Sequence, residues 1–145
     1  MNQTADRPAR VSLGVQASAQ KVWKALVEPE TIRKYMMGTN VVTDWQEGNE
    51  ISWEGEWEGK AYKDKGTSLK NEPERLLRYT HFSPLTGEPD IPENYHTVTV
   101  ELASEGSGTR VTLTQDNNET EKARADSEKN WTAMLEGLEE IVETS

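Results

Sequence analysis

The chain has 145 residues, with 26 acidic and 16 basic side chains, a net charge of −10 at pH 7 and no cysteine. One domain with its own core is expected, whereas disulfides, thiolate metal ligands and a cysteine nucleophile are excluded, and the charge disfavours a nucleic-acid partner. No apolar run approaches the roughly 18 residues of a membrane span and no secretory leader is visible, so we expect a cytoplasmic protein with no membrane partner.

The first predicted elements are a strand and a helix. Residues 1–9 are polar, and we expect them to form a flexible tail before a single domain of residues 10–145. Apolar and polar side chains alternate over residues 10–16, which is typical of a strand with one buried face. Ser18 is a favourable N-cap for the helix that follows, and Pro29 ends that helix.

A second, short helix is predicted directly after the first. Pro29 suits its first turn, and Gly38 is available to stop it. Helical spacing turns Ile32, Tyr35 and Met36 toward the interior. The two helices should therefore form one compact unit.

The clearest strand covers residues 50–58, between turn signals at residues 46–49 and 58–60. Side chains alternate between an apolar, largely aromatic set and an acidic set, so the two sets must lie on opposite faces of the sheet. We expect Trp53 and Trp57 on the concave face, with Glu54, Glu56 and Glu58 toward solvent.

Two more strands are predicted over residues 61–71 and 75–82. The turn signals on both sides of the strand at 50–58 favour a meander of neighbouring antiparallel strands. For the second strand, periodicity leaves two inward-facing sets open. These sets are Leu77, Tyr79 and His81, or Leu76, Thr80 and Phe82.

Residues 83–94 contain three prolines and a glycine, too many helix and strand breakers for a regular element. We expect a long loop there, of the kind that often carries function. A hairpin follows: residues 95–103 alternate in hydrophobicity, residues 105–108 form a glycine-rich turn, and Val111 and Leu113 face inward from the partner strand.

The last predicted element is a long helix over residues 118–142. Its first half, residues 119–130, is almost wholly polar, so that end should border solvent or a cavity mouth. The second half carries an apolar stripe and should be packed. The stripe consists of Trp131, Met134, Leu135, Leu138, Ile141 and Val142.

This order of elements resembles the helix-grip fold of the START-like (SRPBCC) superfamily, which includes birch-pollen-allergen-like proteins. More narrowly, the chain resembles bacterial proteins related to the C-terminal domain of the activator of the heat-shock-protein-90 ATPase, over residues 11–142. Four stretches carry the likeness: ASAQKVWKAL at 17–26, PETI at 29–32, EPERL at 72–76 and WTAMLEGL at 131–138.

The resemblance implies an α+β fold in which a curved antiparallel sheet wraps a long C-terminal helix, with an apolar cavity between them. Members of the family bind lipophilic molecules, act on polyketide-like compounds or assist a chaperone. Two positions depart from the family pattern. Tyr35 stands where many relatives have tryptophan, and Gly48 with Asn49 stands where a glycine pair is common.

Few residues indicate chemistry. His81 and His96 are the two histidines of the chain, and their spacing matches no familiar metal site. We therefore expect no metal or cofactor, and a hydrogen-bonded or exposed role for each ring. No Gly-x-Ser-x-Gly elbow supports a nucleophilic serine, so no catalytic residue is assigned. Acid or base chemistry remains open for Asp64, Tyr62, Tyr95 or His96, if one of them projects into the cavity.

The leading functional hypothesis is the binding of a small hydrophobic molecule between the sheet and the last helix, because aromatic walls with a few polar groups suit such ligands. The alternatives are a module that interacts with a chaperone partner and a hydrolase or cyclase acting on a lipophilic substrate. The residues expected to bind the ligand are Tyr35, Met36, Trp53, Trp57, Tyr79, His96, Trp131, Met134 and Leu135.

Overall fold

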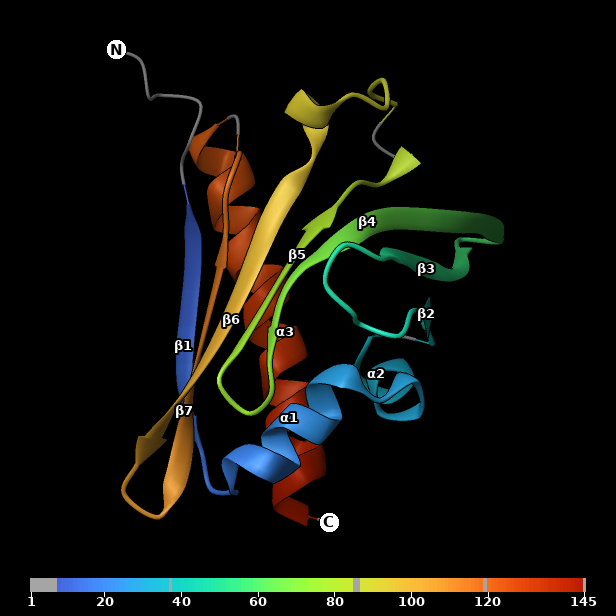
Figure 1. The fold of residues 1–145 in the computed structure, drawn as a ribbon. Helices are drawn as coiled ribbons and strands as arrows, with labels where there is room; N and C mark the ends of the chain where they lie inside the picture. Colours follow the sequence, from blue (N-terminus) through green and yellow to red (C-terminus); the bar gives the residue numbers. More distant parts are fainter. Residues whose placement is uncertain (1–7, 37, 85–86, 119, 145) are drawn as a thin grey trace.

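A computed structural model describes residues 8–36, 38–84, 87–118 and 120–144, with the backbone alone at residue 57. These residues form one curved antiparallel sheet that wraps a long C-terminal helix (Figure 1). Two short helices follow the first strand, as the α+β expectation required.

The sheet has seven strands among the described residues, in the order β1-β7-β6-β5-β4-β3-β2. The last strand in sequence thus pairs with the first, and the remaining strands form a meander. The strands are β1 (Ala9–Val15), β2 (Asn40–Val42), β3 (Glu50–Trp57), β4 (Lys60–Glu72), β5 (Leu76–His81), β6 (His96–Glu105) and β7 (Gly108–Gln115). The helices are α1 (Ala19–Val27), α2 (Pro29–Tyr35), the 3₁₀ helix η3 (Pro92–Asn94) and α3 (Glu121–Thr144).

The predicted helix signals act as expected at α1 and α2. The Ser18 hydroxyl accepts a hydrogen bond from the Lys21 backbone N–H at 3.2 Å and caps α1. Pro29 occupies the first turn of α2. Gly38, with φ of 84°, donates its N–H to the Arg33 carbonyl at 2.9 Å, a bond that closes the end of the helix.

Alternation along β3 places Ile51 and Trp53 in the core, with 1% and 6% of their surfaces exposed. Glu54 is half-buried, so the prediction that Trp53 is less exposed than the glutamate beside it is confirmed. Glu56 is exposed as predicted, but it also borders the cavity described below. Glu58 is exposed in the turn after the strand. The Trp57 side chain, for which the same prediction was made, lies outside the described residues.

The open choice at β5 is settled by burial. Leu77 and Tyr79 are buried in the main hydrophobic core, so the set that includes His81 faces inward. Phe82 is buried as well, but it follows the strand and stacks on Tyr95 with ring centroids 5.1 Å apart. Tyr95 belongs to the irregular segment before β6, so the alternation of side chains along β5 could not predict its contact with Phe82.

Several boundaries differ from the predictions. Strand β1 begins at Ala9, which is fully buried, whereas residues 1–9 were expected to be a tail; residues 1–7 lie outside the described residues. The loop at 83–94 contains the 3₁₀ helix η3, because Pro92 is accommodated at a first helical turn. Helix α3 begins at Glu121, where the Thr120 hydroxyl caps the Ala123 N–H at 3.0 Å, three residues after the predicted start.

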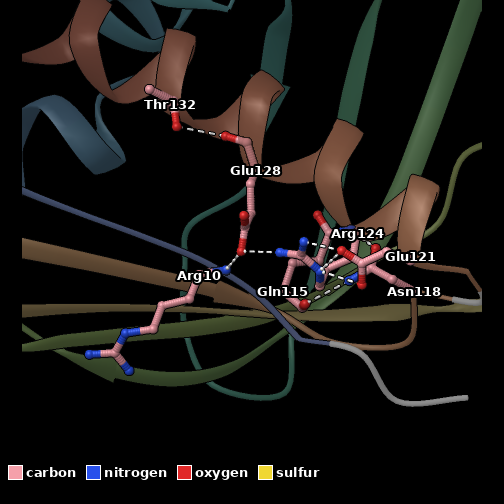
Figure 2. A network of polar contacts seen from close by, with 7 residues as sticks. All are labelled: Arg10, Gln115, Asn118, Glu121, Arg124, Glu128 and Thr132. Atoms are coloured by element: carbon pink, nitrogen blue, oxygen red, sulfur yellow. Dashed lines mark hydrogen bonds and ion pairs between the residues drawn. The ribbon is translucent and has the colours of Figure 1, made fainter. Parts of the chain in front are cut away.

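Helix α3 is packed in two different ways along its length. Its C-terminal half buries Leu135, Leu138 and Val142 against the sheet and α1. Its N-terminal half is held by the polar network of Figure 2, in which Glu128 accepts hydrogen bonds from the Arg10 backbone N–H (3.0 Å) and pairs with Arg124 (2.7 Å). Among the described residues, no helix is long and apolar enough to cross a membrane.

Candidate functional site

A cavity of about 690 Å³ lies between the concave face of the sheet and the N-terminal half of α3. Its size is within the range of small-molecule sites, which is roughly 300–1,000 Å³. Strands β3 to β7 supply one wall, and Ala123, Ser127 and Asn130 of α3 supply the other. The helix half that the sequence marks as polar therefore borders the cavity.

Aromatic rings form the apolar surface of the cavity. Trp53 packs on Tyr79 with ring centroids 5.4 Å apart, and both rings line the cavity. Trp131 faces them from α3, where its indole N–H donates to the Gln115 side-chain oxygen at 2.6 Å. The alternation of side chains along β3 and β5 turns Trp53 and Tyr79 toward the inside of the sheet. The hydrogen bond to Gln115 sets the orientation of the Trp131 ring.

A carboxylate and an imidazole meet on this wall. His81 Nε2 lies 2.9 Å from Asp64 Oδ2, and the side chains are 31% and 14% exposed. The other oxygen, Asp64 Oδ1, is buried without a hydrogen-bond partner among the described residues. The Trp53 ring meets the His81 ring edge-on at 4.9 Å. The register of β3 against β4 brings Trp53 into this group, because Trp53 and Asp64 are direct partners across the two strands.

The second histidine lies beside the first. His81 and His96 are partners across β5 and β6, and both line the cavity. His96 Nδ1 lies 2.9 Å from the Asp116 carbonyl oxygen, which can only accept a hydrogen bond, so Nδ1 carries a proton. Each histidine is thus hydrogen-bonded, as expected, and each ring has its orientation set by an acceptor.

Hydroxyl groups complete the polar part of the wall. The Thr39 and Tyr62 hydroxyls are hydrogen-bonded to each other at 2.7 Å. The Tyr79 side chain is 6% exposed, and its ring contacts the rings of Trp45 and Trp53. Burial raises the pKa of the Tyr79 phenol above its usual value. Tyr79 therefore remains a neutral hydrogen-bond donor at physiological pH.

A second, much smaller void of about 20 Å³ shares part of its lining with the cavity and also borders α2. Tyr35 lines this void, and its hydroxyl donates to the Ala25 carbonyl at 2.8 Å. Burial, with a smaller contribution from the nearby Tyr79, raises the pKa of Tyr35 above its usual value. This hydrogen bond from the Tyr35 hydroxyl links α2 to α1.

The predicted ligand-binding residues therefore occupy three kinds of position. Tyr35 and Leu135 line the small void, and the Trp57 side chain lies outside the described residues. The others line the large cavity, namely Met36, Trp53, Tyr79, His96, Trp131 and Met134. Their role in ligand binding stays a prediction.

Sequence reasoning missed the pairing of Asp64 with His81 and the contribution of Thr39, Phe82 and Gln115 to the wall. Alternation along β4 places Tyr62 and Asp64 on one face, which was a usable signal. The partner of Asp64 lies 17 residues away on another strand, so only the register of β4 against β5 reveals it. No group of three side chains suited to a metal ion occurs among the described residues.

The amino-acid sequence matches the model of one known protein family. The sequence model of the family described as "Activator of Hsp90 ATPase homolog 1-like protein" matches residues 16–143. The chain belongs to this family. The comparison with curated proteins gave no match.

Solved structures agree with this membership of the Hsp90 ATPase activator homolog 1-like family. A protein of Cytophaga hutchinsonii, solved in solution, is 56% identical, with a TM-score of 0.85 and coverage of 95% of this chain and 94% of that one. A Chromobacterium violaceum protein is 21% identical, with a TM-score of 0.80 and coverage of 94% and 96%. CalU16 of Micromonospora echinospora is 22% identical, with a TM-score of 0.75 and coverage of 94% and 76%. The last two show the fold alone, and the family and fold are consistent with START-like ligand-binding domains.

Proposed function

We propose that the protein binds a small hydrophobic molecule in the cavity between the sheet and α3. The observation that carries this proposal is the cavity itself, which has about 690 Å³ of volume and aromatic walls at Trp53, Tyr79 and Trp131. A protein that acted only through its outer surface would have no need of such a volume. Burial of the ligand against these rings supplies the driving force, at roughly 25 cal/mol per Å² of apolar surface.

Two measurements test whether a molecule occupies the cavity. Native mass spectrometry of freshly purified protein should show a mass increment that disappears on denaturation. Titration with a hydrophobic fluorophore should give saturable binding with a negative heat-capacity change, the mark of apolar burial. The absence of both an increment and saturable binding would overturn the proposal.

A pair of variants on one helix assigns the binding to this cavity. Ala123 lines the cavity, whereas Ala125, two residues along α3, is exposed and does not line it. Ala123→Trp should fill part of the mouth and weaken binding at least about tenfold. Ala125→Trp adds the same side chain outside and should leave binding unchanged, so equal effects of the two variants would contradict the assignment.

Catalysis on a lipophilic substrate is a second candidate, and the Asp64–His81 pair favours it. A carboxylate that accepts a hydrogen bond from one imidazole nitrogen leaves the other nitrogen available to take a proton. A hydrolase or cyclase would place its reacting group within hydrogen-bond reach of that nitrogen. Turnover that is lost in His81→Gln while ligand binding is kept would separate this activity from binding alone.

The family description favours a third candidate, an interaction with a chaperone of the heat-shock-protein-90 class. Such a partner would use the outer surface and would leave the cavity accessible. Stimulation of the chaperone ATPase by wild-type protein and by Ala123→Trp alike would support this role. We place it after ligand binding because a surface interaction gives no reason for the cavity.

A further inference from the structure

The cavity has a one-sided set of charges. Its lining contains the acidic residues Glu56, Asp64, Glu88 and Asp126, and no lysine or arginine among the described residues. Asp126 is paired on the exposed side of α3 with Lys122 at 2.9 Å, whereas Asp64 is enclosed. A carboxylate ligand would find no lysine or arginine on these described walls and would be repelled by their carboxylates.

Two basic residues next to lining positions in the sequence, Lys65 and Arg124, are engaged with other partners. Lys65 pairs with Asp90, and Arg124 pairs with Glu121 and Glu128. Figure 2 shows the Arg124 guanidinium paired with these two glutamates. Recruiting either cation to an anionic ligand would break an existing ion pair.

The imidazole nitrogens that remain are hydrogen-bond acceptors when the rings are neutral. His81 Nε2 donates to Asp64, which leaves Nδ1 with its lone pair. His96 Nδ1 donates to the Asp116 carbonyl, which leaves Nε2 with its lone pair. The negative charge of Asp64 lies directly behind the first of these acceptors. A ligand with N–H donors and a positive charge complements this arrangement.

The neighbouring rings add a further attraction for a cation. The faces of tryptophan and tyrosine rings attract ammonium groups by about 0.5–2 kcal/mol, most strongly where water is excluded. Trp53 lies against His81 and packs on Tyr79, so the aromatic surface and the acceptors occupy the same part of the wall.

We infer that the cavity takes a hydrophobic ligand that carries a protonated amino group, held against the Asp64–His81 pair, and that it excludes fatty acids and other carboxylates. This inference rests on the proposed function and specifies the ligand class. It explains why a cavity with aromatic walls lacks a basic anchor.

Three probes of similar shape and different charge test the inference by titration calorimetry at pH 7. They are 2-(1-naphthyl)ethylamine, 2-(1-naphthyl)ethanol and the anion of 1-naphthaleneacetic acid (the acetate probe). These carry an ammonium, a hydroxyl and a carboxylate group, respectively. We expect the amine to bind at least about tenfold more tightly than the acetate, with the alcohol between them. Equal binding of all three, or tighter binding of the acetate, would overturn the inference and leave cavity binding standing. Failure of all three to bind would overturn the inference, while the mass spectrometry and fluorophore titration described above would still decide on cavity binding.

Two variants that each remove one negative charge locate the anchor. Asp64→Asn keeps the shape of the side chain and its acceptor for His81, and it should reduce the preference for the amine over the acetate to about threefold or less. Glu101→Gln makes the same change in net charge at an exposed position of β6 outside the lining, and it should keep the full preference. A preference that survives in Asp64→Asn, or that falls equally in both variants, would overturn the assignment to Asp64.

Discussion

The indole of Trp131 lies at the boundary between the packed core and the cavity. It is half-buried, it lines both the cavity and the small void, and its N–H is bonded to Gln115 at 2.6 Å. Trp53, in contrast, is 6% exposed and contacts two rings. These two tryptophans therefore contribute differently to stability.

Replacement by alanine should separate the two roles. Removing a buried tryptophan costs roughly 3–5 kcal/mol, and we expect a loss in this range for Trp53→Ala, because the side chain is 6% exposed although it also lines the cavity. Trp131→Ala should cost less, about 2 kcal/mol, because the Trp131 side chain is only half-buried and loses fewer packing contacts. Free energies of unfolding from urea titration measure both changes. Equal losses, or an unchanged midpoint for Trp131→Ala, would show that the indole does not lie at such a boundary.

At this scale the sequence predicts faces but not partners. Alternation correctly places Trp53 on the inner face, and helical spacing correctly turns Met36 toward the interior. The contact between Asp64 and His81 depends on strand register, which a single sequence determines poorly when several polar pairings are possible. The site was therefore predictable as an aromatic wall and not as a set of polar neighbours.

Strand β4 shows why element boundaries were harder to predict than element types. It runs over thirteen residues, and its pairing with β5 shifts register between Ser68 and Lys70. Such a bulge bends the strand and helps the sheet curve around α3. The alternation of polar residues in this region gives no sign of the shift, whereas the hairpin of β6 and β7 was predicted because glycine marks its turn.

Gly66 is the glycine on which the close approach of β4 and β5 depends. A methyl group at this position would overlap the Thr80 carbonyl group, which belongs to the backbone and cannot move aside cheaply. Gly66→Ala should therefore destabilise the fold by roughly 3 kcal/mol, at the upper end of overpacking effects. Thermal unfolding followed by circular dichroism measures the loss.

Gly14 provides the control for this prediction. A methyl group there would meet the Glu105 side-chain oxygen at 2.7 Å, an atom at the end of a flexible chain. Gly14→Ala should cost less than about 1 kcal/mol, because that side chain can shift. A loss for Gly66→Ala no greater than that for Gly14→Ala would show that the strands separate easily at this point.

Across the whole molecule, one helix is used both to close the core and to leave a cavity. The apolar residues of α3 seal the sheet against α1 at its C-terminal half, where Leu138 is 1% exposed. The N-terminal half has no buried side chain among the described residues and is positioned by ion pairs at the surface. The packed part of the core and the opening of the cavity therefore lie along different halves of the same helix.

Two tyrosines, Tyr79 in the cavity wall and Tyr35 beside the small void, make the stability of the whole fold sensitive to alkali. Burial raises the pKa of both Tyr35 and Tyr79 above the ordinary value of 10.0. Below pH 10 both phenols are neutral in the folded and unfolded chains, and their contribution to stability is fully present. Above pH 10 the unfolded chain loses these protons while the folded chain keeps them, so the free energy of unfolding falls as pH rises. Each tyrosine should add about 1.4 kcal/mol per pH unit to this decline. Urea titrations between pH 9 and about 11.5 should show a slope in wild-type protein that steepens through pH 10. In the double variant Tyr35→Phe with Tyr79→Phe the slope should be shallower, by an amount that approaches about 2.8 kcal/mol per pH unit only above about pH 11, where the unfolded phenols are ionised. The comparison uses slopes and not absolute stabilities, because Tyr35→Phe also removes the hydrogen bond to the Ala25 carbonyl. An identical slope in the two proteins would mean that the phenols ionise as readily in the folded chain as in the unfolded one, which their burial does not allow.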